Sequence, residues 1–226
     1  MTNGRNVYHP PGADGRMHAP ATARNRDFIL EVLKDVLPPS GTILEVASGT
    51  GEHAVYMVPR LQNRAWQPTD VDDGRIASIE AWRTASDAPD NIDNILPALR
   101  LDACAPRWPV EEHPPAAPVT AILAINLIHI APWAVCLGLM AGAGRILAEG
   151  GVLYLYGPYK RGGVHTAPSN ESFDANLKAQ DPSWGVRDLD DVIKVALKAG
   201  LVLLKVVDMP ANNLSVVFKK QTEAYA

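Results

Sequence analysis

The strongest constraint on the fold is a short apolar run that passes through two glycines into a helical pattern, in the string TILEVASGTGEHAVY at residues 42–56. The apolar half has the composition of a buried parallel strand. Gly49 and Gly51 leave the backbone without side chains where the chain turns, so a ligand can lie close to it. The helix after this turn starts above the carboxyl end of the strand, which is where open α/β sheets bind nucleotide-like cofactors.

Two cofactors compete for this loop. Residues 49–54 satisfy the G-x-G-x-x-G/A pattern of dinucleotide binding, so a nicotinamide enzyme is one hypothesis. S-adenosylmethionine is the other, because its site on this architecture usually has an acid followed by small residues at alternating positions, here Glu45, Ala47, Gly49 and Gly51. Glu45 favours the second cofactor, since a carboxylate at the strand end can receive the ammonium group of its methionine part. A glycine turn in an unrelated α/β domain is the remaining alternative.

The composition is that of one domain that binds a small molecule. The chain has 226 residues, of which 47% are hydrophobic, enough for a sizeable core. Its 21 basic and 25 acidic residues give a formal net charge of -4, so no basic field is available for nucleic acid. Cys104 and Cys136 have neither paired nor metal-like spacing, which indicates reduced thiols in a cytoplasmic protein and no metal site.

The ends of the chain suggest its organisation. Residues 1–20 are rich in glycine and proline and are expected to form a flexible arm before a single domain at residues 21–226. We find no secretion signal at the start, and polar breaks interrupt the apolar run around residues 121–143, so we expect no membrane-spanning segment. The protein is expected to be a monomer or a homodimer.

Acids follow the next two expected strands. Asp70 lies about 20 residues beyond the glycine pair, the offset at which an acid reaches the ribose hydroxyls of a bound nucleoside. Asp102 and Ala103 end the strand expected at residues 98–102, where an acid can bind an adenine amino group and a backbone N–H can meet a ring nitrogen. A turn-forming acid before a proline is the alternative for Asp102.

The almost purely apolar run at residues 119–125 predicts a central strand, and its polar end predicts catalytic side chains. Asn126 offers both a donor and an acceptor, and His129 is a candidate base, with a packing histidine as the alternative. The strand expected at residues 152–156 ends in Tyr156, whose aromatic face suits a sulfonium cation. Tyr159 follows as a substrate contact, although core packing explains either tyrosine equally well.

Two further segments are expected to close the site. The helix predicted at residues 21–37 begins near Arg24 and Asn25, which either contact the cofactor or form a solvated helix start. The polar segment 160–187 is expected to be a substrate lid. Its candidate substrate residues are His165, Asn170, Asp174 and Ser183.

The C-terminal pattern separates the two cofactor hypotheses. Residues 201–209 and 214–219 are rich in strand-forming residues and are joined by a turn signal, which predicts a hairpin. A closing antiparallel pair on a mostly parallel sheet is typical of class I methyltransferases and uncommon in nicotinamide domains. We therefore expect an α/β, Rossmann-like fold of seven strands with a C-terminal antiparallel hairpin.

Several strings in order resemble the methyltransferase-like protein 26 family: RNRDFIL, LEVASGTGEHA, WQPTD, YGPY, SNESFD, WGVRD and DMPANN. The similarity runs from about residue 21 to residue 219. It implies an S-adenosylmethionine-dependent enzyme of the class I fold, with cofactor contacts at Glu45, Gly49, Gly51, Asp70 and Asp102. Ala47 stands where many class I enzymes have glycine, a departure this family shares. The resemblance implies no particular substrate.

The leading functional hypothesis is methyl transfer to a small molecule by in-line displacement, catalysed mainly by positioning and desolvation. Cyclisation of the cofactor's aminobutyrate arm with release of methylthioadenosine is the alternative, with Asn126, Tyr156 and Ser183 around the cofactor. A non-catalytic cofactor-binding protein is a third hypothesis, and a nicotinamide dehydrogenase is the last.

Overall fold

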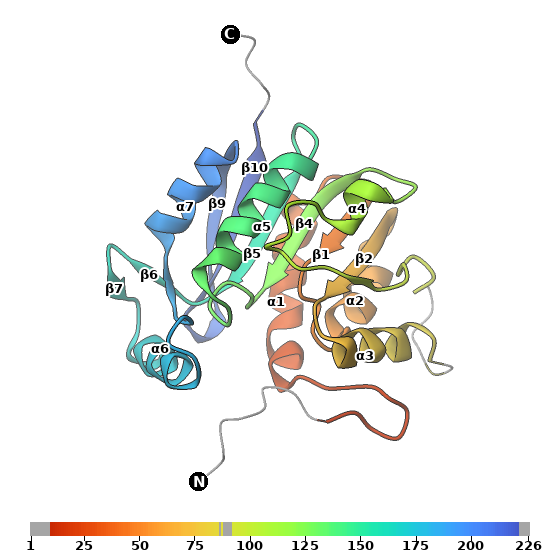
Figure 1. Ribbon diagram of the computed structural model, residues 1–226, viewed down its shortest axis with the longest axis horizontal. Helices are drawn as coiled ribbons and strands as arrows, with labels where there is room; N and C mark the ends of the chain where they lie inside the picture. The colour runs from red at the N-terminus through yellow and green to blue at the C-terminus, as the bar shows by residue number, and fades with distance from the viewer. Residues whose placement is uncertain (1–9, 86, 88–91, 222–226) are drawn as a thin grey trace.

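In the computed structural model, the described residues, 10–85, 87 and 92–221, form a seven-stranded sheet with the order β3-β2-β1-β4-β5-β10-β9 (Figure 1). Strands β1 to β5 run parallel, and β10 pairs antiparallel with both β5 and β9. The predicted fold class is therefore confirmed. The strands are β1 (Gly41–Glu45), β2 (Arg64–Asp70), β3 (Leu99–Arg100), β4 (Val119–Ile125), β5 (Val152–Gly157), β9 (Leu201–Met209) and β10 (Asn213–Lys220).

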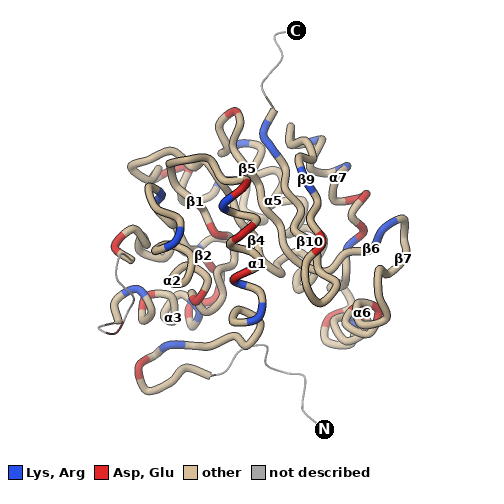
Figure 2. Tube along the Cα trace, turned by 180° about the vertical axis from the view of Figure 1, so that it is seen from behind, with Lys and Arg blue, Asp and Glu red and all other residues tan. Residues whose placement is uncertain are grey.

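Helices cover both faces of this sheet. Figure 1 shows α4, α5 and α7 on the near face, and Figure 2, from behind, shows α1 and α2 over the other. None of the helices in the described ranges is long and apolar enough to cross a membrane. The helices are α1 (Pro20–Val36), α2 (Glu52–Met57), α3 (Asp73–Arg83), α4 (Pro109–Glu112), α5 (Trp133–Ile146), α6 (Pro168–Gln180) and α7 (Leu189–Lys198), with 3₁₀ turns η1 (Val58–Arg60) and η2 (Pro210–Asn212).

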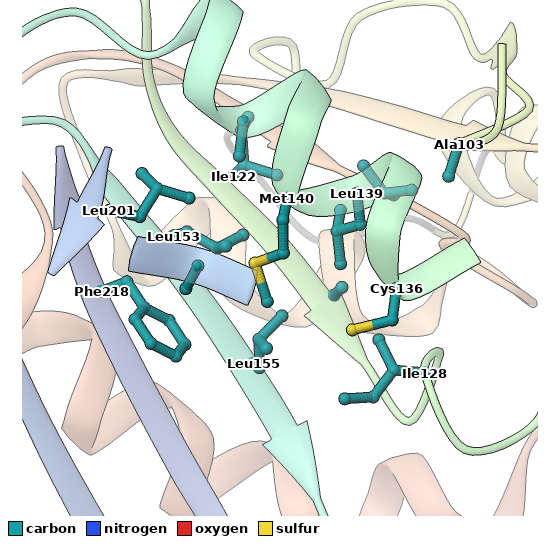
Figure 3. Close-up of a cluster of buried hydrophobic side chains, with 14 of the residues drawn as sticks. Ala103, Ile122, Ile128, Cys136, Leu139, Met140, Leu153, Leu155, Leu201 and Phe218 are labelled. Carbon is teal, nitrogen blue, oxygen red and sulfur yellow. The ribbon is translucent and has the colours of Figure 1, made fainter. Parts of the chain in front are cut away.

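Each face of the sheet has its own apolar core. On the α5 face, Leu139 and Met140 are fully buried against β4 and β5 (Figure 3). Burying a side chain of this size stabilises the fold by about 1.5–3 kcal/mol. On the other face, α1 buries Ile29 and Leu33 against the β1 side of the sheet. Because the cores fix β1 and β4 from both sides, the loops that leave these strands start from rigid positions.

The predicted lid contains more regular structure than its sequence suggested. A second sheet, also within the described residues, has the order β7-β6-β8 and is formed by β6 (Tyr159–Arg161), β7 (Val164–His165) and β8 (Arg187–Asp188). Helix α6 lies between β7 and β8 in the chain, and the sequence did not indicate it because its largely polar residues lack a strong apolar stripe. Asn170 ties α6 to the main body by donating to the Asn212 carbonyl at 2.9 Å.

The described part of the N-terminal arm lies against α3. The Met17 N–H donates to Ser78 Oγ at 2.8 Å, and Trp82 Nε1 donates to the Met17 carbonyl at 3.1 Å. The arm predicted at residues 1–20 falls partly outside the described residues, since residues 1–9 are not among them. Helix α1 begins at Pro20, and both the boundary of the arm and its flexibility stay predictions.

Candidate functional site

The loop after β1 turns through three residues with left-handed backbone conformations. Their φ angles are 59° at Ala47, 61° at Gly49 and 90° at Gly51. Glycine adopts these angles without steric cost, whereas alanine at such a position is strained by about 1–2 kcal/mol. At Gly51 a Cβ atom would also lie 3.0 Å from the Ile79 Cα atom of α3. The glycine spacing that drew attention in the sequence is thus set by this turn and by its packing on α3.

A cleft of about 380 Å³ opens beside this loop, at the carboxyl ends of β1 and β4. Five of the sequence-predicted site residues line it: Asn25, Glu45, Ala47, Gly49 and Asn126. The lining also includes residues that were not predicted: Ala19, Ala21, Thr22, Ser48, Thr50, His53, Arg75, Ile125, Leu127, Ile130, Gln180 and Trp184. The cleft is therefore formed by the glycine loop, the loop after β4, the start of α1 and the C-terminal end of the lid.

Glu45 is the buried acid of the cleft. Its side chain is 1% exposed and accepts a hydrogen bond from Trp66 Nε1 at 3.0 Å. Burial raises the pKa of Glu45 to about 7, and the Trp66 N–H opposes this rise. The Arg75 guanidinium, which also lines the cleft, pairs with Asp70, with Nη1 3.6 Å from Oδ1. A buried carboxylate in this state gains most from a ligand that brings its own positive charge.

Asp70 lies beneath the glycine loop rather than on the lining of the cleft. Its fully buried carboxylate accepts from the backbone N–H groups of Gly49 at 3.0 Å and Val71 at 2.8 Å. These hydrogen bonds join the end of β2 to the loop after β1, so Asp70 holds the loop in shape. Its predicted contact with a ribose stays a prediction.

Asp102 and Ala103 follow β3 and also stand apart from the cleft lining. Asp102 is exposed and accepts from the Cys104 N–H at 2.8 Å, which agrees with the turn-forming alternative. Ala103 is buried against α5, where a Cβ atom on Gly138 would lie 2.2 Å from its carbonyl oxygen. Their predicted contacts with an adenine ring are not tested by these positions.

Asn126 leaves β4 in a left-handed conformation with a φ of 56°. Asparagine tolerates this conformation better than most residues, which explains its position at this strand end. Its backbone N–H donates to the Tyr156 carbonyl at 2.8 Å, so the turn is tied to β5, and the residue lines the cleft. Of the three predicted catalytic residues, Asn126 is the one on the lining.

His129 lies inside the core and not in the cleft. It is 0% exposed, and its ring meets the Tyr159 ring edge-on with centroids 5.9 Å apart. Neither ring nitrogen has a hydrogen-bond partner among the described residues. Burial lowers the pKa of His129 to about 3, and the nearby Arg187 guanidinium adds to this effect. The structure thus places His129 as the packing histidine, which differs from the predicted catalytic base.

The two predicted tyrosines are buried as well. Tyr156 is 5% exposed, and burial raises the pKa of its hydroxyl while the amides of Asn213 and Asn25 oppose this change. Tyr159 is 0% exposed in the α5-side core, and burial raises its pKa well above the ordinary value. Because neither ring is on the cleft lining, the predicted substrate contact of Tyr159 is replaced by core packing.

The predicted substrate residues of the lid organise the lid itself. Asp174 accepts from Lys178 Nζ and from the Val186 N–H, both at 2.7 Å, and lies 3.3 Å from His165 Nε2. Asn170 bonds to η2, as described above. Ser183 is exposed and donates to Asp181 Oδ1 at 2.6 Å. This network sets the end of α6 and the segment after it, from which Gln180 and Trp184 reach the cleft.

His53 of α2 is a cleft residue that the sequence analysis missed. It is 8% exposed, and its Nε2 atom lies 3.0 Å from Asn25 Oδ1 on α1. Burial lowers the pKa of His53 to about 4, with a contribution from the Arg26 guanidinium, so the ring is neutral at pH 7. Asn25 therefore lines the cleft, whereas its neighbour Arg24 is exposed and off the lining, and the predicted cofactor contacts of both stay predictions. The position of His53, two residues after Gly51 in the first turn of α2, is the sequence signal that could have identified it.

Comparison with known proteins agrees with this architecture. The family model described as "Protein of unknown function (DUF938)" matches residues 16–220. The chain belongs to the DUF938 family. That match includes every predicted site residue of this DUF938 protein, from Arg24 to Ser183. Its resemblance to the methyltransferase-like protein 26 family stays a prediction.

Solved structures share the fold of this DUF938 protein at low sequence identity. An O-methyltransferase family protein from Burkholderia thailandensis matches with a TM-score of 0.70 and 12% identity, over 90% of this chain and 58% of that one. An O-methyltransferase family 2 protein from Planctomyces limnophilus DSM 3776, in complex with apigenin, matches with a TM-score of 0.66 and 18% identity, over 86% of this chain and 61% of that one. The calicheamicin biosynthesis methyltransferase CalO1, in its SAH bound form, matches with a TM-score of 0.66 and 14% identity, over 88% of this chain and 54% of that one. The chain thus has the class I methyltransferase fold and spans little more than half the length of these proteins.

Proposed function

We propose that the cleft binds S-adenosylmethionine and that the protein transfers its methyl group to an uncharged small molecule. The observation that carries the proposal is Glu45, a carboxylate that is 1% exposed yet lines the cleft, with a pKa raised to about 7 by burial. An ammonium group beside it would favour its ionised form. The methionine part of this cofactor brings such a group, whereas a nicotinamide dinucleotide does not.

The arrangement of strand ends supports the same ligand. Glu45 and Ala47 lie where β1 ends, and β2 and β3 come next to β1 in the sheet order. Parallel strands present their carboxyl ends on one edge of a sheet, so an extended ligand that starts at Glu45 would pass toward β2 and β3. We retain Asp70, Asp102 and Ala103 as the proposed neighbours of its adenosine part.

The acceptor would occupy the end of the cleft between the loop after β4 and the lid. Leu127 and Ile130 contribute apolar surface from that loop, and Gln180 and Trp184 contribute from the lid. None of these four lining residues carries a charge, so this end favours an uncharged acceptor. The solved relatives include a protein in complex with apigenin, a ligand of that protein. We infer a small, largely apolar acceptor here.

The residues of the chain would act mainly by positioning. When bound, the cofactor supplies an electrophilic methyl group on a sulfonium centre. Asn126 would orient the acceptor through its side-chain amide at the strand end, and Trp184 would exclude water from the reacting atoms. Neutral His53 would hold Asn25 and the start of α1 against the glycine loop through its 3.0 Å contact. As the methyl carbon forms its bond to the acceptor, its bond to sulfur breaks and the proton of the acceptor would pass to a solvent water molecule, so that no side chain has to supply a strong base.

The cyclisation alternative finds less support in the geometry. It requires Asn126, Tyr156 and Ser183 around the cofactor, and only Asn126 is on the cleft lining. Tyr156 is buried behind the lining, and the Ser183 hydroxyl bonds to Asp181 at the surface. We therefore favour transfer to a second molecule.

Calorimetric titration with S-adenosylmethionine and S-adenosylhomocysteine tests the proposal. We expect both to bind, NADH not to bind, and Glu45→Gln to weaken binding at least about tenfold, because a neutral amide does not attract the ammonium group. Glu31→Gln is the matched control, since Glu31 is 71% exposed and, among the described residues, forms an ion pair with Lys34 on α1. Lack of binding by the wild-type protein would overturn the proposal.

A further inference from the structure

The carboxylate of Glu52, at the start of α2, joins two segments that both line the cleft. Its Oε2 atom accepts from the Ala19 N–H at 2.6 Å and from Thr50 Oγ1 at 2.9 Å. Its Oε1 atom lies 3.1 Å from His18 Nδ1. Ala19 precedes α1, and Thr50 belongs to the glycine loop. A single side chain thus bonds both to the residue before α1 and to the glycine loop.

Residues 16–19, which we call the strap, are held over α3 by further contacts. Ser78 Oγ accepts from the Met17 N–H and donates to the Thr50 carbonyl, both at 2.8 Å, so it connects the strap to the glycine loop a second time. The Arg16 guanidinium carbon lies 4.7 Å from the centroid of the Trp82 ring. The His18 and Trp82 rings meet in an edge-to-face contact with their centroids 5.1 Å apart. Figure 1 shows this segment running alongside α3 before α1 begins.

The strap leads directly into one wall of the cleft. Ala19, Ala21, Thr22 and Asn25 all line the cleft from the strap end and the first turns of α1. The glycine loop on the other side of the Glu52 contact contributes Ser48, Gly49 and Thr50. The width of the cleft between these two walls therefore depends on whether the Glu52 carboxylate holds both.

We propose that Glu52 is a positioning residue that keeps the strap closed over the cofactor cleft, and that cofactor enters and leaves when this contact opens. The identity of the ligand in this proposal rests on the proposed function. The closure of the strap by Glu52 does not depend on it. Hydrogen bonds to a charged carboxylate are among the stronger ones in proteins, so a neutral replacement loosens both segments at once. A glutamine at position 52 has almost the same size and shape as the glutamate. Its amide NH₂ group cannot accept a hydrogen bond, so at least one of the contacts made by the carboxylate is lost.

The experiment compares wild type, Glu52→Gln, Ser78→Ala and the control Glu31→Gln in two measurements. The first is stopped-flow dissociation of S-adenosylhomocysteine, where we expect about tenfold faster release from Glu52→Gln, a smaller increase for Ser78→Ala and no change for the control. The second is the rate of tryptic cleavage after Arg16 in the protein without ligand. We expect this rate to rise in the same order, while thermal unfolding shows that all four proteins remain folded.

The outcomes separate the two proposals. Equal cleavage rates after Arg16 in wild type and Glu52→Gln would overturn the strap proposal, whether or not S-adenosylhomocysteine binds. Faster cleavage with unchanged ligand release would also overturn it, because the strap would then open without controlling the cleft. If wild type does not bind S-adenosylhomocysteine but Glu52→Gln is cleaved faster, the proposed function fails and the closure by Glu52 stands. Protection of wild type from cleavage by the bound ligand supports both.

Discussion

Trp66 Nε1 donates a hydrogen bond to Glu45 Oε2 at 3.0 Å, and both side chains are 1% exposed. Trp66 lies on β2 and Glu45 ends β1, and the two strands are paired so that Trp66 is next to Ile43 in register. The indole is the strongest influence that favours the ionised carboxylate, against a burial effect that raises its pKa to about 7. The charge state of the proposed ammonium site is thus set from the neighbouring strand.

Trp66→Phe should therefore move the pH dependence of cofactor binding. The free protein binds an ammonium group only when Glu45 is ionised, so affinity rises with pH around a midpoint of about 7 and falls again where the ligand's own ammonium group loses its proton. Removal of the N–H donor raises the pKa of Glu45 further, and the midpoint of this rise should move up by about one pH unit. Calorimetric titration of S-adenosylhomocysteine from pH 5.5 to 9 measures the shift.

Trp108→Phe is the matched control for this change. Trp108 is equally buried, and its Nε1 donates to the Ala103 carbonyl at 3.3 Å on the other face of the sheet. It should cost stability without moving the pH midpoint. An unchanged midpoint in Trp66→Phe would show that the indole does not govern Glu45.

Ala47→Gly should leave the protein as stable as wild type or stabilise it by up to about 1 kcal/mol. The left-handed backbone at φ 59° strains alanine, and this relief is partly offset by the greater entropy of glycine in the unfolded chain. Ala211, with a φ of 57° in η2, should respond in the same way, and Ala23→Gly inside α1 should lose about 1 kcal/mol. Urea unfolding measures all three. A loss at position 47 as large as that at position 23 would contradict the explanation from strain.

Local patterns predicted those parts of the molecule that depend on neighbouring residues in the sequence. The almost purely apolar run at residues 119–125 is strand β4 with the same bounds, because a strand buried on both faces needs a mostly apolar sequence. The strand, loop and helix around Gly49 were likewise predicted from the local sequence pattern alone.

The remainder of the site depends on how distant elements pack. His53 reaches the cleft because α1 lies beside α2 and Asn25 meets its ring, a relationship between residues 28 positions apart. Asp174 is an acid in a polar lid, which predicts a substrate contact, but it is satisfied by Lys178, His165 and the Val186 N–H. Composition shows that a segment is polar and does not show which of its polar groups bind one another.

His129→Leu should make the protein less sensitive to acid. Burial holds the pKa of His129 at about 3, whereas an unfolded histidine titrates near 6.5, so the unfolded chain takes up the proton first as pH falls. The free energy of unfolding therefore falls between pH 6.5 and 3, by about 1.4 kcal/mol per pH unit from this residue. In the variant, the free energy of unfolding should fall less steeply as the pH is lowered. Urea unfolding at a series of pH values from 7 to 4 measures this slope.

Two comparisons isolate this effect. His53, with a pKa lowered to about 4, contributes a slope of the same sign, and Glu45 contributes the opposite sign between 4.5 and about 7, in wild type and variant alike. His113 is exposed, and His113→Leu should leave the slope as it is. An unchanged slope in His129→Leu would mean that the native state protonates this ring together with the unfolded chain.

Trp184→Ala should weaken acceptor binding and leave cofactor binding within about twofold. Trp184 lines the cleft from the lid, Leu127 and Ile130 line it from the loop after β4, and Glu45 lines it from the end of β1. Loss of one aromatic wall should reduce the affinity for a planar apolar probe about tenfold, and Trp184→Phe should restore most of it. The probe is 2-naphthol, titrated into protein saturated with S-adenosylhomocysteine, with 2-naphthoate as the charged counterpart. Because this end of the cleft offers no cation among its four lining residues, 2-naphthol should bind more tightly than 2-naphthoate, and the reverse order would contradict the inference of an uncharged acceptor.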